Sequence, residues 1–223
     1  MAYTLGDTVT KVQQRVRDTG YSSGEIKNYV NDAQNDIFNE YRLPFMEATQ
    51  NYTLSIGVSD ITNGDGLPGN YVQAIDVILT TDDQERKLVY RDIREIDAEY
   101  PDPDDADAYS AGTPVYWYNY ADTIRVFPVP ASADTVTVRY YKKPTELTSD
   151  AQVPEVPSEF GEILVVGASY RVLQVKDNYD QAGVHQNKYD ELLQKLVNKY
   201  SYKQVGTVPR MRINRYRVDR AQF

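Results

Sequence analysis

The 223-residue sequence contains no cysteine, and this absence excludes disulfide scaffolds, thiolate metal sites and cysteine nucleophiles. Histidine is almost as scarce, since His185 is the only one. No apolar run approaches the roughly 20 residues that span a bilayer, and no signal peptide opens the chain. We therefore expect a soluble intracellular protein without a membrane partner.

Outside the C-terminal segment, acidic residues outnumber basic ones. The formal net charge is −9, which argues against a general DNA- or membrane-binding surface. From Lys203 onward, however, six cations stand against one anion, Asp219. This segment therefore carries about +5 and the remainder about −14, and such a division predicts that the two parts face different partners.

Among the aromatic residues, phenylalanine and tryptophan are few, with 5 and 1 copies, whereas tyrosine has 20. Tyrosine combines apolar area with a hydroxyl that tolerates water, which suits surfaces that become buried on assembly. Half-exposed strand faces account for the rest of the tyrosines.

Four segments have the periodicity of amphipathic or buried helices. Capping boxes at Thr4 and Ser22 predict the start of the first two, and Pro44 stops the second. The other two helices are predicted over residues 160–173 and 180–200. Each of the two helical pairs, taken by itself, would bury only one face of its helices. We therefore expect all four helices to share one core.

Between these helical pairs, the pattern changes to strands separated by turn residues. Strands are predicted over residues 48–56, 71–80, 86–90, 115–119, 123–127 and 135–141, and a short helix over 92–100. The predicted fold class is α+β, with a four-helix core, an inserted antiparallel β-domain built as a sandwich or small barrel, and an extended C-terminal arm. The corresponding segments are 1–47, 48–156, 157–202 and 203–223.

His185 is the only side chain with the chemistry of a neutral-pH base, and it falls on the apolar face of the last predicted helix. Catalysis by histidine needs a nucleophile and an orienting carboxylate nearby, and the local sequence supplies neither. We expect a packed or hydrogen-bonded structural role. The sequence predicts no enzyme, no catalytic residue and no cofactor.

An acidic loop is the first candidate site, and it comprises Asp102, Asp104, Asp105 and Asp107. An EF-hand beginning at Asp102 needs glycine at its sixth position and glutamate at its twelfth, where this chain has Asp107 and Thr113. We predict no metal here and interpret the loop as a solvated lining or rim of a channel. A looser calcium site stays open as an alternative.

Trp117 lies between Tyr116 and Tyr118, an arrangement found in carbohydrate-stacking platforms. Strand alternation places the two tyrosines on one face and the tryptophan on the other. A core tryptophan with two half-exposed tyrosines is the structural interpretation, and a stacking surface is the functional one.

The C-terminal arm is the strongest candidate for a binding site. Cations and apolar residues approximately alternate in it, so an extended strand would present guanidinium groups on one side and apolar side chains on the other. Nucleic-acid contact and a merely disordered basic tail are the alternatives. The predicted binding residues are Arg210, Met211, Arg212, Ile213, Arg215, Tyr216, Arg217, Val218, Arg220 and Phe223.

Several short motifs in this order resemble a head-to-tail adaptor (connector or neck) protein of tailed bacteriophages, of the kind with a β-insert in a helical bundle. The resemblance covers most of the chain. It depends on Asn31-Asp32-Ala33-Gln34, on the small pair Gly167-Ala168, and on the strings G-T-P-V-Y-W-Y, I-R-V-F-P-V-P, R-Y-Y-K-K-P-T-E-L-T and V-P-E-V-P.

The resemblance implies a structural virion protein, assembled in the host cytoplasm, that forms a ring, usually a dodecamer, between portal and tail. Such a ring extends the DNA channel and carries a platform for tail or further neck proteins, and the arm reaches the portal protein. DNA passes through without specific binding, because an acidic wall repels it. A ligand- or carbohydrate-binding β-module of a phage or cell-surface assembly is the competing hypothesis.

Overall fold

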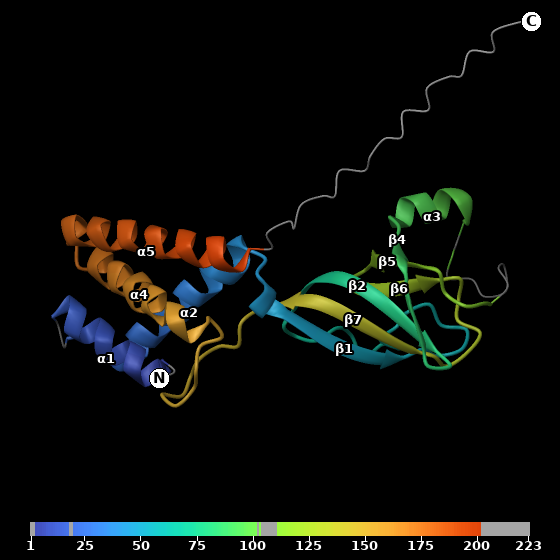
Figure 1. Cartoon of the computed structure of the whole chain (residues 1–223), viewed down its shortest axis with the longest axis horizontal. Helices are drawn as coiled ribbons and strands as arrows, with labels where there is room; N and C mark the ends of the chain where they lie inside the picture. Colours follow the sequence, from blue (N-terminus) through green and yellow to red (C-terminus); the bar gives the residue numbers. More distant parts are fainter. Residues whose placement is uncertain (1–2, 18–19, 102, 104–110, 202–223) are drawn as a thin grey trace, which may run out of the picture.

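The computed structural model describes residues 3–17, 20–101, 103 and 111–201 of the 223-residue chain. The longer helices gather at one end of an elongated molecule, and the strands lie at the other end together with one short helix (Figure 1). The α+β class predicted from the sequence is therefore confirmed. Two segments join the parts, one before the first strand and one after the last.

The helical part contains α1 (Leu5–Val16), α2 (Ser23–Glu40), α4 (Gly161–Val175) and α5 (Tyr179–Tyr200). Both predicted capping boxes are present. The backbone N–H of Asp7 donates to the Thr4 hydroxyl at 3.1 Å, and that of Glu25 donates to the Ser22 hydroxyl at 3.2 Å. Local sequence alone thus sets where the first two helices begin.

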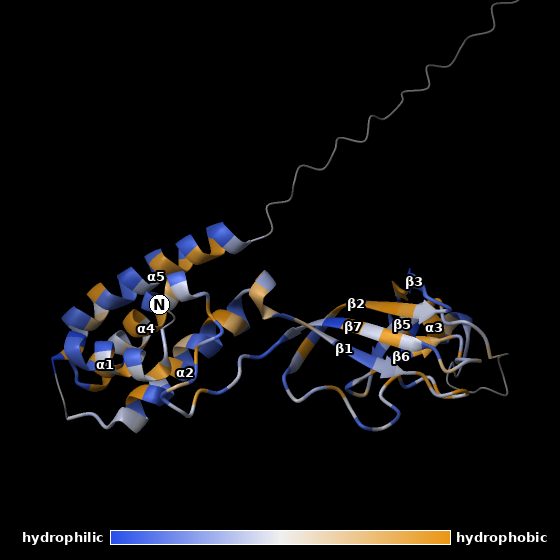
Figure 2. Cartoon of the chain, turned by 60° about the horizontal axis from the view of Figure 1, so that its bottom comes forward, coloured by the Kyte–Doolittle hydropathy of each residue, from blue (hydrophilic) through white to orange (hydrophobic). Residues whose placement is uncertain are grey.

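α4 lies at the centre of the helical part and contacts α1, α2 and α5. It is the most apolar of these helices and lies among neighbours with mixed hydrophilic and hydrophobic faces (Figure 2). Residues 143–160 lead from the last strand back to α4 and are called the returning segment. Its residues Leu147 and Val156 pack into the same core. None of the described helices has both the length and the apolar character to cross a bilayer.

The strands form two sheets whose inner faces share a second core. The first has the order β1-β7-β2-β3 and is antiparallel; the second has the order β4-β5-β6. The strand bounds are β1 Glu47–Thr53, β2 Tyr71–Thr81, β3 Gln84–Lys87, β4 Val89–Tyr90, β5 Tyr116–Tyr120, β6 Thr123–Phe127 and β7 Thr135–Lys142.

The prediction of one strand over residues 86–90 is wrong, because the chain changes sheet at Leu88. The N–H of Leu88 donates to Val77 in the first sheet at 2.9 Å, whereas the N–H of Val89 donates to Val115 beside the second at 3.0 Å. The Leu88 side chain is 2% exposed and lies in the shared core. As a result β4 pairs with β5 in parallel orientation.

The prediction that Tyr118 is half-exposed is also wrong. Strand alternation does separate Trp117 from Tyr118, but both faces of β5 are covered. Trp117 packs in the core between the sheets, and Tyr118, with 0% exposure, packs against Ile96 of the short helix α3 (Ile93–Glu99). A stacking platform that needs Tyr118 is therefore excluded.

Candidate functional site

The junction between the helices and the strands is held by buried side-chain amides of α2. The Asn31 amide nitrogen donates to the Leu147 carbonyl at 3.0 Å, and its oxygen accepts from the Leu147 N–H at 2.9 Å. Asn31 is only 8% exposed. The Asn31 side chain thus bonds to both the N–H and the carbonyl of Leu147, as the backbone of a neighbouring strand does in a β-sheet.

One helical turn further along α2, Gln34 holds two points of the same returning segment. Its amide nitrogen donates to the Thr145 carbonyl at 3.2 Å, and its oxygen accepts from the Glu155 N–H at 3.1 Å. Gln34 is buried. The chain leaving β7 and the chain approaching α4 are therefore fixed to one face of α2.

Glu155 adds a charged contact to the junction. Its carboxylate forms an ion pair with Lys142 at the end of β7 and accepts from the Thr145 N–H and hydroxyl at 3.0 and 2.8 Å. Burial alone would raise the pKa of this carboxyl, but the bonds from Lys142 and Thr145 outweigh it and hold the pKa below the usual value.

A lowered pKa makes the contribution of Glu155 depend on pH. The stabilisation is complete above the usual carboxyl range and is lost as the pH falls through the lowered pKa. Glu155→Gln should therefore be less stable than the wild-type chain at pH 7, and the difference should shrink as the pH approaches 2. Urea unfolding at several pH values measures it; a difference that does not change with pH contradicts this prediction.

Ala33, between the two amide residues, packs against α4 where that helix carries Gly167. A Cβ built on Gly167 would meet the Ala33 Cβ at 2.9 Å and the Tyr189 ring at 3.0 Å. The motif Asn31-Asp32-Ala33-Gln34 thus contacts both the returning segment and α4. These motifs lie far apart in the sequence, and no local signal shows that they meet.

The end of α5 is fixed beside this junction. The Tyr200 ring packs edge-on against Phe45 and Phe160, with centroid distances of 5.6 and 6.1 Å. Glu159 binds both Lys199 and the Tyr200 hydroxyl, and these two bonds lower the pKa of its carboxyl. These contacts hold the C-terminal end of α5 against the rest of the helical part.

Both sites predicted from the sequence lie outside the described residues. The predicted arm comprises Arg210 to Phe223, and the predicted acidic loop comprises Asp102, Asp104, Asp105 and Asp107. In the sequence this loop lies between α3 (Ile93–Glu99) and β5, and both of these elements belong to the part of the molecule remote from α1, α2, α4 and α5 (Figure 1). In the described part of the chain, no group of three or more acidic or histidine side chains is placed to hold a metal ion.

His185 lies partly buried on α5, near Arg15 of α1 and Glu162 of α4. Burial, together with the positive charge of Arg15, lowers the pKa of its imidazole. A neutral imidazole at pH 7 fits the structural role expected from the sequence, which stays a prediction.

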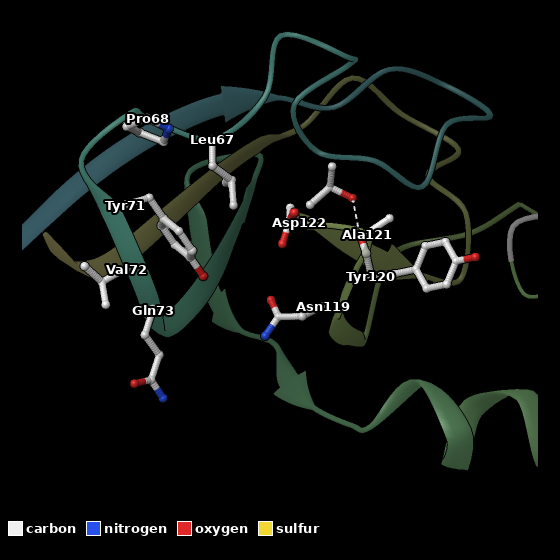
Figure 3. Close-up of a pocket in the computed structure, with 10 residues that line it drawn as sticks. Leu67, Pro68, Tyr71, Val72, Gln73, Asn119, Tyr120, Ala121 and Asp122 are labelled. Carbon is white, nitrogen blue, oxygen red and sulfur yellow. Dashed lines mark hydrogen bonds between the residues drawn. The ribbon is translucent and has the colours of Figure 1, made fainter. Parts of the chain in front are cut away.

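An open pocket of about 640 Å³ lies between the start of β2 and the turn that joins β5 to β6 (Figure 3). Tyr71 points into it from β2, with its hydroxyl accepting from the Ala74 N–H at 2.7 Å. Asn119 approaches from the opposite side, whereas the Tyr120 ring is directed away. Neither Trp117 nor Tyr118 lines this pocket.

The described residues thus form a helical part and a strand part that are joined through buried polar contacts. A family model described as SU10 adaptor protein matches residues 3–213. The chain therefore belongs to the SU10 adaptor protein family, which makes it a structural adaptor of a bacteriophage and a virion component. No curated protein matches its sequence.

Proposed function

We propose that this adaptor forms a ring between the portal and the tail, where it extends the DNA channel and provides the platform for tail attachment. Membership of the adaptor family supports this role. The rigidly held junction supports it further, because a ring component must keep its two ends in a fixed relation. The four-helix core, with the β-domain inserted into it, is then the unit that repeats around the ring. The resemblance to head-to-tail adaptors implies a ring of twelve copies.

The basic arm, Arg210–Phe223, binds the portal protein in this proposal. The single observation that carries it is the position of Tyr200, whose packing against Phe45 and Phe160 fixes the point from which the arm departs. The 22 residues beyond Ser201 span up to about 70 Å when extended. Their excess of arginine suits a carboxylate-lined surface, which guanidinium groups bind in bidentate fashion.

Removal of the arm tests this role. A chain that ends at Tyr202 should stay folded, because both cores lie within residues 3–201, and should lose attachment to the portal. Co-sedimentation with purified portal measures attachment, and particle imaging of the mixture should show a rotationally symmetric collar only with the full chain.

A matched variant separates charge from bidentate geometry. Replacing Arg210, Arg212, Arg215 and Arg217 by lysine keeps the charge, so partial binding is expected, whereas replacement by glutamine should abolish it. Undiminished attachment of the truncated chain would remove the arm from the mechanism.

The remaining partners follow from the same proposal. The acidic loop around Asp102 to Asp107 lines or rims the channel, where it repels the passing DNA. A tail or second neck protein binds the platform, assembly takes place in the host cytoplasm, and the protein performs no catalysis.

Ligand binding by the strand part is a second candidate function, and the open pocket between Tyr71 and Asn119 is the observation that favours it. A glycan array tests it. Binding that is lost on Asn119→Ala would support this function, and an array without binding would count against it.

A further inference from the structure

One face of the helical part carries a row of carboxylates. Asp32, Asp36 and Glu40 follow one another at four-residue spacing along α2, so they share one side of that helix. Asp190 of α5 lies close enough to act electrostatically on Tyr41, next to Glu40. All four residues are exposed, and together they define the α2–α5 acidic surface.

This surface has little internal neutralisation. Arg171 of α4 forms an ion pair with Asp36. Within the described residues, no lysine or arginine forms an ion pair with Asp32, Glu40 or Asp190. Three carboxylates therefore remain available to a basic ligand.

A buried hydroxyl points to a ligand at the same place. Tyr189 of α5 is 7% exposed, and its hydroxyl oxygen has no hydrogen-bond partner among the described residues. The Tyr189 ring lies where α4 meets α2, because a Cβ built on Gly167 would meet both the Ala33 Cβ at 2.9 Å and this ring at 3.0 Å. Ala33 is next to Asp32 and three residues before Asp36 on α2, and the charges of Asp36 and Glu40 act on the hydroxyl. A buried hydroxyl without a partner costs free energy, so a ligand that supplied a hydrogen-bonding group there would stabilise it.

The chain itself contains a segment that matches this surface in charge. Residues 203–223 carry six cations and one anion. Within them, Arg210 and Arg212 are two residues apart, as are Arg215 and Arg217. In an extended chain this spacing is about 6.6 Å, close to the roughly 6 Å between successive carboxylates at four-residue spacing on a helix.

The segment also starts within reach. Tyr200 packs against Phe45, which in turn packs against Phe38 of α2, so α5 ends next to the end of the carboxylate row. Asp190 lies ten residues before Tyr200, a distance of about 15 Å along the helix. The nine residues from Ser201 to Arg210 span up to about 30 Å, enough to turn back onto the row.

We propose that the α2–α5 acidic surface binds the arm Arg210–Phe223 of the same chain in the free subunit, and that the arm leaves it when a partner binds. The inference depends on the proposed function only for the identity of that partner. A free subunit thereby keeps its arginine-rich arm from binding other anionic surfaces before assembly.

Disulfide trapping in the full-length chain tests this proposal, because the natural sequence has no cysteine to interfere. Asn39→Cys places a thiol on the exposed side of α2, seven residues beyond Asp32, and Asn214→Cys places one in the arm. The pair should form an intrachain disulfide under mild oxidation at low salt, and the rate should fall as salt is added. The control pair, Ala98→Cys on α3 with Asn214→Cys, should react slowly.

Charge-matched variants identify the surface. Asp32→Asn, Glu40→Gln and Asp190→Asn together should slow the intrachain disulfide about tenfold, since three exposed charge contacts are lost. Glu95→Gln, Asp97→Asn and Glu99→Gln on α3 remove equal charge and should leave the rate unchanged.

Three results would overturn the proposal: equal rates for the two cysteine pairs, equal slowing by the two sets of charge variants, or disulfides that join two chains instead of one. Portal is absent from this assay, so its outcome is independent of whether the arm binds the portal.

Discussion

Asn31→Ala is expected to lower the free energy of unfolding by roughly 3 kcal/mol, because it leaves two backbone groups buried without partners. The Leu147 N–H and carbonyl both bond to the Asn31 amide. Leu147 itself is buried in the helical core, so water does not replace the lost contacts without opening the junction.

Urea or thermal unfolding measures the effect. Asn35→Ala is the matched control, since Asn35 lies on the exposed side of the same helix, and its change should stay within about 0.5 kcal/mol. Equal stability losses in the two variants would mean that helix propensity, and not the junction, accounts for the effect.

Gly167→Ala is expected to lower the free energy of unfolding by about 1–2 kcal/mol, although alanine is the better helix former by about 1 kcal/mol. The new Cβ would lie 2.9 Å from the Ala33 Cβ. Ala33 has no flexible side chain that moves aside, so α2 and α4 must separate locally.

Gly183→Ala on α5 is the control, because a Cβ there meets nothing within 4 Å. It should raise the free energy of unfolding by about 0.5–1 kcal/mol. Thermal unfolding of both variants should therefore give changes of opposite sign; stabilisation by Gly167→Ala would show that the contact between α2 and α4 is looser than described.

Local signals account for the features of the fold that were predicted correctly. The caps at Thr4 and Ser22 are contacts between residues three apart, so the sequence contains both partners. The change from helical to strand periodicity likewise depends only on neighbouring residues. The class α+β follows from these signals, and the structure confirms it.

Errors occur where a distant segment decides the outcome. Periodicity places Leu88 in the middle of a strand. Leu88 still bonds to Val77 across the hairpin of β2 and β3, but the N–H of Val89 bonds to Val115, which is remote in sequence, and so the chain changes sheet there. Tyr118 reads as half-exposed, but α3 covers it. Periodicity has no information on either contact.

For the candidate sites, too, the sequence shows the local motifs but not the contacts between distant residues. The motif containing Asn31 and Gln34 and the segment to which it binds are both recognisable in the sequence, but the bonds between them connect residues 111 to 121 positions apart. The arm and the acidic loop were selected from charge and pattern alone. They stay predictions, and the truncation and trapping experiments address the arm.

The pairing of β1 with β7 has a mechanical consequence. β1 is the strand that follows the helices and β7 the strand that precedes the return to them, and the two are hydrogen-bonded from Glu47 with Tyr141 to Thr53 with Thr135. The strand part is therefore attached by a two-stranded ribbon, which cannot swivel about single bonds as one flexible linker does. We therefore expect a torque applied at the far end of the strand part to be carried through this ribbon to the junction with α2, and not to be absorbed by rotation within a linker.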